Sequence, residues 1–262
     1  MTIACSGNAA AAGIQITPHR AIYQMRLEQS RQSSQIASTE GKMMFTINDA
    51  CDGWTSEQKL DMKYYYVDGK DAANTIANSS WEAKDGTRYV FTARSTSNSQ
   101  ETATFRGQAE LGATGGKAVY SEPKSKTVEL KSAARFPTQH TLEILNYAAR
   151  GEKIPNRIVF DGSDEYGQSE ISIFVGKPSP LAAAMDITGK LRGNPLLQED
   201  AWPVRMAFYP LEASEAGTPD YEMTIDLLPN GVARSMLVDY GDFSVRGTLT
   251  NLEALPAGGC SR

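Results

Sequence analysis

Several stretches of the chain alternate between apolar and polar positions, which is the period of a β-strand with one buried face. Residues 19–29 (HRAIYQMRLEQ) place apolar side chains at every second position. The same period continues in residues 42–48 and 57–67. We therefore expect these three stretches to be long, half-buried strands.

Short turn signals separate the strand-like stretches. Asp85-Gly86 precedes an aromatic run at residues 89–91, and Asn230-Gly231 separates residues 221–228 from 232–240. Asn-Gly and Asp-Gly between alternating runs are strong signals of a β-hairpin. A further strand is expected at residues 243–249. Strands that follow one another through short turns predict an antiparallel, up-and-down sheet.

One segment has a helical period instead. Residues 138–150 (TQHTLEILNYAAR) carry an apolar stripe, and Pro137 before them and Gly151 after them suit a helix start and end. The stripe consists of Leu142, Leu145, Ala148 and Ala149. We expect one main helix covering an open face or mouth of the sheet, and long loops at residues 95–101 and 177–200.

Composition is that of a globular protein with its own core. The chain has 262 residues and a formal net charge of −5. The acidic balance argues against nucleic-acid binding, which needs clustered Lys and Arg. No apolar run reaches the roughly 18 residues of a transmembrane helix. A single domain over residues 16–262 is expected.

The first 15 residues are expected to lie outside that domain. They begin MTIACSGNAAAAG, with a cleavage-like alanine run but no basic region before it. Three interpretations stay open: the remnant of a secretory signal whose start lies upstream, a lipidation site at Cys5, and an unstructured cytosolic terminus.

Residues capable of catalysis or metal binding are sparse. His19 and His140 are the only histidines, and neither has a metal-like partner nearby in sequence, so we interpret both as structural or surface residues. Residues 112–117 (GATGGK) lack the Ser or Thr that completes a phosphate loop. Residues 161–167 (DGSDEYG) lack the final glutamate of a calcium loop. Both are interpreted as turns, and no cofactor is expected. A serine triad assembled from distant segments stays open.

Aromatic side chains recur on successive predicted strands. They either line a cavity for a lipid or acyl chain or form a filled core, and nearby methionines favour an adaptable pocket. The candidate binding-face residues are Tyr64, Tyr66, Trp81, Tyr89 and Phe91.

The order of short motifs resembles that of the cell-envelope integrity protein EipB family, a periplasmic domain of unknown function. The resemblance covers residues 16–262. The matching segments are 17–23 (TPHRAIY), 41–43 (GKM), 49–54 (DACDGW), 136–138 (FPT), 141–143 (TLE), 159–162 (VFDG), 221–222 (YE), 237–243 (LVDYGDF) and Cys260.

The resemblance implies a single, highly curved antiparallel sheet, a β-spiral or open barrel near a helix, with the outline of a lipoprotein carrier. It implies a periplasmic location and a disulfide between Cys51 and Cys260. An exported protein lies where disulfides persist, which agrees with that pairing. The family brings no known catalytic activity and no active-site residues.

The first functional hypothesis is a non-enzymatic periplasmic protein that supports envelope integrity. It would bind a lipid, a lipoprotein segment or an envelope protein in the curved sheet. The alternative is a protein–protein scaffold with a filled core. An envelope hydrolase is a third and weaker hypothesis.

Overall fold

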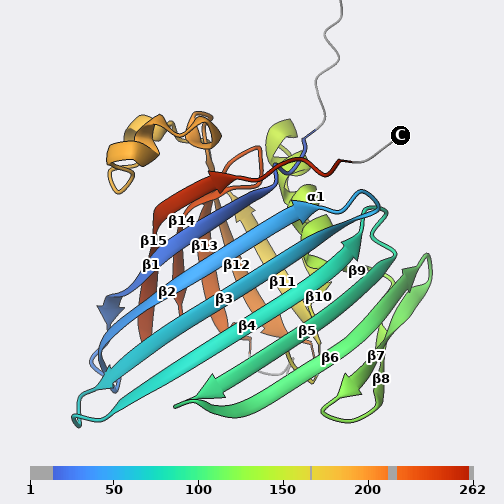
Figure 1. The fold of residues 1–262 in the computed structure, drawn as a ribbon, viewed down its shortest axis with the longest axis horizontal. Helices are drawn as coiled ribbons and strands as arrows, with labels where there is room; N and C mark the ends of the chain where they lie inside the picture. Colours follow the sequence, from blue (N-terminus) through green and yellow to red (C-terminus); the bar gives the residue numbers. More distant parts are fainter. Residues whose placement is uncertain (1–13, 166, 212–216, 260–262) are drawn as a thin grey trace, which may run out of the picture.

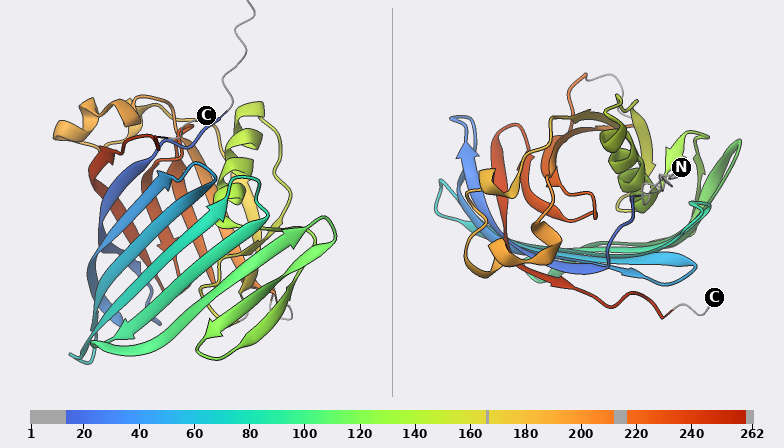
Figure 2. Two further views of the ribbon diagram at one scale, coloured as in Figure 1. Left: turned by 45° about the vertical axis from the view of Figure 1, so that its right-hand side comes forward. Right: turned by 90° about the horizontal axis from the view of Figure 1, so that it is seen from above.

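The computed structural model describes residues 14–165, 167–211 and 217–259. They form one continuous 15-stranded sheet, with a single α-helix among the described residues. The sheet curls into an open, barrel-like spiral, and the helix lies inside the curl (Figures 1 and 2). The predicted fold class, mainly β with one main helix, is confirmed.

The first eight strands form an antiparallel meander in which each strand pairs with the next in sequence. Their alternating apolar positions turn inward; in the first of them, Ala21, Tyr23 and Met25 are buried. The strands are β1 (His19–Ser30), β2 (Ile36–Asp49), β3 (Gly53–Tyr66), β4 (Asp71–Ala83), β5 (Arg88–Ser97), β6 (Gln100–Gly112), β7 (Gly115–Glu122) and β8 (Lys126–Leu130).

The second half of the sheet begins after a short turn. Its strands are β9 (Ala134–Arg135), β10 (Arg157–Phe160), β11 (Gln168–Val175), β12 (Trp202–Pro210), β13 (Tyr221–Leu227), β14 (Ala233–Asp239) and β15 (Phe243–Ala254). We expected antiparallel pairing throughout, and the pair β9–β10 is parallel instead. The helix connects these two strands, and such a crossover brings the chain back in the same direction.

The two halves join through the first and last strands. β15 pairs antiparallel with β1, from Phe243 opposite Ser30 to Ala254 opposite His19. The ends of the folded chain therefore lie in the middle of the sheet. The free edges, β8 and β9, come from the middle of the sequence and lie on the same side of the molecule (Figure 1).

The helix α1 (Pro137–Arg150) begins one residue before the predicted range and ends where expected, and Gly151 follows it with a φ of 65°. Its buried face differs slightly from the expected stripe, since Ala149 is exposed and Leu142 is only partly buried. Inside the curl, the helix is covered on more than one side, so its buried face is wider than one apolar stripe (Figure 2). The buried residues are Thr138, His140, Ile144, Leu145 and Ala148.

Of the two predicted loops, one is present and one is not. Residues 177–200 form a strap with three short 3₁₀ helices, η1 (Leu181–Ala183), η2 (Gly189–Gly193) and η3 (Pro195–Leu197). The expected loop at 95–101 is wrong: β5 and β6 continue through it and leave a two-residue turn at Asn98-Ser99. Pairing with neighbouring strands overrides the weak strand propensity of its Ser and Asn residues. No helix within the described ranges has the length and apolarity of a membrane span.

Candidate functional site

An apolar cavity of about 220 Å³ lies beside the start of α1, between the two halves of the sheet. Residues from both halves and from the helix line it. They are Ile16, Tyr23, Met43, Phe45, Ile47, Ser56, Pro137, Thr138, Thr141, Met223, Ile225, Leu227, Gly231, Ala233 and Met236. Three of these are methionines, whose flexible thioethers adapt to ligands of irregular shape.

The polar atoms in this wall already have partners within the protein. The Tyr23 hydroxyl donates to the Ala233 carbonyl at 2.6 Å, and burial raises the pKa of Tyr23, so the phenol stays neutral. The Thr141 hydroxyl donates to the Pro137 carbonyl at 3.0 Å. The Ser56 and Ser80 hydroxyls lie 2.8 Å apart. The cavity wall therefore favours an apolar occupant.

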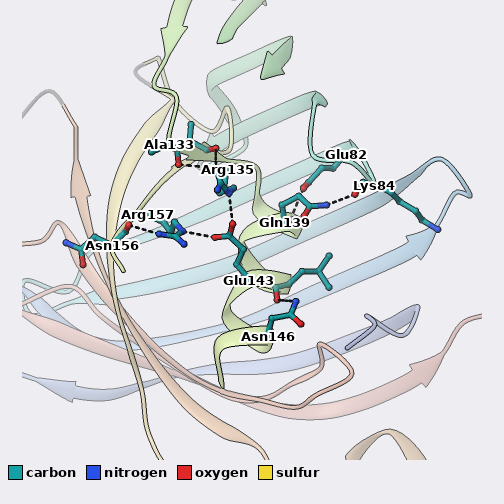
Figure 3. Close-up of polar contacts among 11 residues, drawn as sticks. Glu82, Lys84, Ala133, Arg135, Gln139, Glu143, Asn146, Asn156 and Arg157 are labelled. Carbon is teal, nitrogen blue, oxygen red and sulfur yellow. Dashed lines mark hydrogen bonds and ion pairs between the residues drawn. The ribbon is translucent and has the colours of Figure 1, made fainter. Parts of the chain in front are cut away.

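The start of α1 is held by a carboxylate from the sheet. The N-cap residue, Phe136, supplies no side-chain cap. Instead, Glu82 of β4 accepts the backbone N–H groups of Thr138 and Gln139 at 2.7 and 2.8 Å. The side-chain amide of Gln139 donates to the Lys84 carbonyl at 2.7 Å (Figure 3). These contacts place the first turn of the helix against the end of β4, beside the cavity.

Glu82 is an unusual cap because it is only 1% exposed. Burial raises its pKa to about 7, and the hydrogen bonds from Thr138 and Gln139 oppose that shift only in part. Near neutral pH, Glu82 therefore exchanges between its charged and neutral forms.

The middle of α1 is held by an ion-pair fork. Glu143 accepts from Arg135 of β9 and Arg157 of β10, each at 2.6 Å (Figure 3). Burial opposes ionisation of Glu143, but hydrogen bonds from the two guanidinium groups outweigh it and hold its pKa below the usual value. The fork fixes the helix to the parallel strand pair.

Both histidines are buried. His19 is 1% exposed, its Nδ1 lies 2.7 Å from the Thr17 carbonyl, and burial lowers its pKa. His140 is 6% exposed, and burial lowers its pKa to about 4. The described part of the chain contains no group of three or more His, Cys, Asp or Glu side chains that could hold a metal ion.

The five aromatic residues predicted for a binding face lie in different places, and none of them lines the cavity. Tyr89 and Phe91 are buried in an aromatic cluster that also contains Phe136 and Phe160. The rings of Tyr89 and Phe136 stack with their centroids 5.0 Å apart. This part of the predicted face is a filled core.

The other three aromatics are only partly buried. Tyr64 meets Phe243 edge-on with the ring centroids 6.2 Å apart. Trp81 lies beneath the Arg88 guanidinium, and Tyr66 ends β3. A binding role for any of the five residues stays a prediction.

Cys51 lies in the turn between β2 and β3, where its backbone has a φ of 67° and its N–H donates to Asp49 at 2.8 Å. Cys5 and Cys260 lie outside the described residues. The pairing of Cys51 with Cys260 therefore stays a prediction.

Most of the cavity lining was not predicted from the sequence. Met223, Ile225 and Met236 lie on the strands that flank the Asn230-Gly231 turn, and their alternation was visible. What was not visible is that β13 and β14 face β2 and the start of α1 across the curl. Glu143 appeared in the sequence only within the matching segment 141–143, and nothing local marked the role of Glu82 or Glu143, because each acts on a partner that only the fold brings near.

Comparison with known proteins agrees with this architecture and confirms the resemblance found in the sequence. The profile of the EipB-like family matches residues 10–256. The chain is 30% identical over 261 residues to the cell envelope integrity protein EipB of Brucella abortus (strain 2308), covering 97% of this chain and 91% of that relative.

A solved structure gives the same result for the fold. The crystal structure of a beta-barrel-like protein of a domain of unknown function from Brucella abortus has a TM-score of 0.84 to this chain at 27% identity. The match covers 93% of this chain and 100% of the other. The chain belongs to the EipB-like family.

Proposed function

We propose that this protein supports the integrity of the cell envelope from the periplasm, without catalysing a reaction. It does so by holding an apolar segment, the acyl chain of a lipid or lipoprotein, in the cavity beside α1. The envelope role is supported by the relative named as a cell envelope integrity protein. The binding role is supported by the cavity.

The single observation that carries the binding proposal is the chemistry of the cavity wall. Apolar side chains from four strands and α1 form most of it, and the hydroxyls of Tyr23, Ser56 and Thr141 are engaged with other protein atoms. A polar ligand would find few free hydrogen-bond partners there. An alkyl chain needs none.

The size of the cavity limits what enters it. Pockets for whole drug-sized ligands are about 300–1,000 Å³, and this cavity is about 220 Å³. It therefore holds part of an acyl chain while the rest of the molecule stays outside. The methionine side chains allow the wall to widen further.

The non-enzymatic proposal is supported by the burial of both histidines. General bases must reach the proton that they remove, and His19 and His140 are 1% and 6% exposed. A protein-only scaffold is the second candidate, supported by the filled aromatic cluster around Phe91.

Filling the cavity tests the binding proposal. Ala233 lines the cavity, so the added carbons of Ala233→Leu would occupy the space that the alkyl chain needs. Titration of the purified chain with a fluorescent fatty acid should show affinity for the parent protein and a loss of at least about tenfold in the variant.

Ala77→Leu is the matched control. Ala77 lies on the outer face of β4 among Lys59 and Arg94, away from the cavity. This variant should bind the fatty acid like the parent. Equal binding by Ala233→Leu, or no binding by the parent together with no lipid adduct in native mass spectrometry, would favour the scaffold.

A further inference from the structure

One edge of the sheet carries backbone groups that pair with no other strand among the described residues. β8 pairs with β7 on one side and is the last strand in the sheet order. It is short, and its burial alternates: Val128 is partly buried and Leu130 is buried, whereas Thr127 and Glu129 are exposed.

Two side-chain contacts show which backbone groups of β8 point away from β7. The Glu129 carbonyl accepts from the Gln168 amide nitrogen at 3.0 Å. The Lys131 N–H donates to the Gln168 amide oxygen at 3.1 Å. In an antiparallel pair, alternate residues direct both backbone groups outward. The N–H and C=O of Thr127, two residues before Glu129, therefore face the same edge.

Gln168 occupies a position that a neighbouring strand would take. A parallel strand donates to the carbonyl of one residue and accepts from the N–H two residues later. The Gln168 carboxamide makes this pair of bonds with Glu129 and Lys131. The Gln168 side chain thus satisfies the outward backbone groups at the C-terminal end of β8, the Glu129 carbonyl and the Lys131 N–H. The outward backbone groups of Thr127 have no backbone partner among the described residues.

A groove of about 380 Å³ runs along this edge. Its charged residues balance, with two lysines and two glutamates, so charge does not select the occupant. Val128 and Leu211 supply apolar surface. The lining residues are Lys126, Thr127, Val128, Glu129, Lys131, Glu165, Gln168 and Leu211.

We propose that the β8 edge is a docking site for an extended peptide segment of another protein, which adds to the sheet parallel to β8. Backbone bonds to Thr127 supply its register. Alternate side chains of the segment point inward beside Val128 and outward beside Thr127, so the segment alternates apolar and polar residues. The parallel direction follows from the bonds that Gln168 already makes.

The probe is a phage-displayed library of random short peptides, selected on the purified chain. Enriched peptides should alternate apolar and polar residues. The tightest one, once synthesised, should slow amide hydrogen exchange in residues 126–131. Thr127→Pro removes the outward N–H without removing a bond to β7, and it should weaken binding of this peptide by about tenfold.

Thr127→Ala is the matched control, because it keeps the N–H and should bind the peptide like the parent. Gln168→Ala frees the Glu129 carbonyl and the Lys131 N–H for the peptide, so this variant should bind the peptide at least as tightly as the parent. The proposal is overturned if no enriched peptide protects residues 126–131, or if Thr127→Pro binds equally well. It is also overturned if the edge is protected by self-association of the chain alone. Protection in the parent needs no variant, so a misfolded Thr127→Pro does not prevent the test.

Discussion

Glu82 determines how α1 begins. A helix leaves its first N–H groups without partners inside the helix, and the residues before Thr138 offer no capping side chain. A carboxylate from another strand fills that role, at the cost of burying an ionisable group. The raised pKa of Glu82 is the physical sign of that cost.

Glu82 makes the stability of the protein depend on pH. Its pKa in the fold, about 7, is above its ordinary value of 4.5, so the folded chain holds this proton more tightly than the unfolded chain. The resulting stability is complete below pH 4.5 and is lost as the pH rises through 7. The loss should be about 3 kcal/mol, from the size of the shift.

Urea unfolding at a series of pH values measures this effect. In Glu82→Gln, which does not titrate, the free energy of unfolding should fall less between pH 5 and 7 than in the parent. Glu57→Gln, at an exposed position of β3, should leave the parental slope unchanged. Equal slopes in the parent and in Glu82→Gln would contradict the assignment.

At the scale of elements, α1 is held by charge as well as by apolar packing. Ile144 and Leu145 pack with β10, β11 and β12 residues, while Glu143 holds the arginines of β9 and β10. The helix thereby fixes the strand pair at one edge of the sheet. The helical periodicity predicted α1 but not the ion-pair fork. The two arginines lie on β9 and β10, which precede and follow the helix in sequence, and only the fold brings both to Glu143.

Glu143→Ala should lower the free energy of unfolding by about 2 kcal/mol, because it leaves two partly buried guanidinium groups without their shared partner. Glu152→Ala removes an ion pair to Arg150 in which half of each side chain is exposed. That control should change stability by less than about 0.5 kcal/mol. Urea unfolding of both variants measures the difference, and equal effects would show that the fork contributes no more than a surface pair.

At the scale of the whole molecule, the first and last strands lie side by side in the centre of the sheet. Beyond β15, the Leu255 N–H still donates to the Pro18 carbonyl at 2.9 Å. The described chain then runs along the rim that also carries the turn with Cys51 (Figures 1 and 2). This course supports the proposed bond between Cys51 and Cys260.

A disulfide between these cysteines closes a loop of about 210 residues. The chain-entropy model gives an upper stabilisation of about 5 kcal/mol for such a loop. Full reduction should therefore lower the melting temperature of the parent protein. A Cys51→Ser/Cys260→Ser double variant should melt at the reduced temperature, with or without reductant. An unchanged melting temperature after reduction would exclude a stabilising bond.

Part of this molecule follows from the sequence alone. The long strands, the hairpins at Asp85-Gly86 and Asn230-Gly231 and the helix α1 were all predicted, because side-chain periodicity and turn chemistry are local properties. The prediction of a loop at 95–101 was wrong because it, too, relied on local properties alone. Its local composition indicates a loop, but pairing between β5 and β6 decides its structure.

The remaining features depend on tertiary structure. The pairing of β1 with β15, the cap that Glu82 gives α1, the cavity between the two sheet halves and the Gln168 bridge at β8 all join residues far apart in sequence. Sheet twist and the order of strand pairing bring them together. The sequence by itself determined which segments are strands and helix, whereas the curl of the sheet decided which side chains face one another.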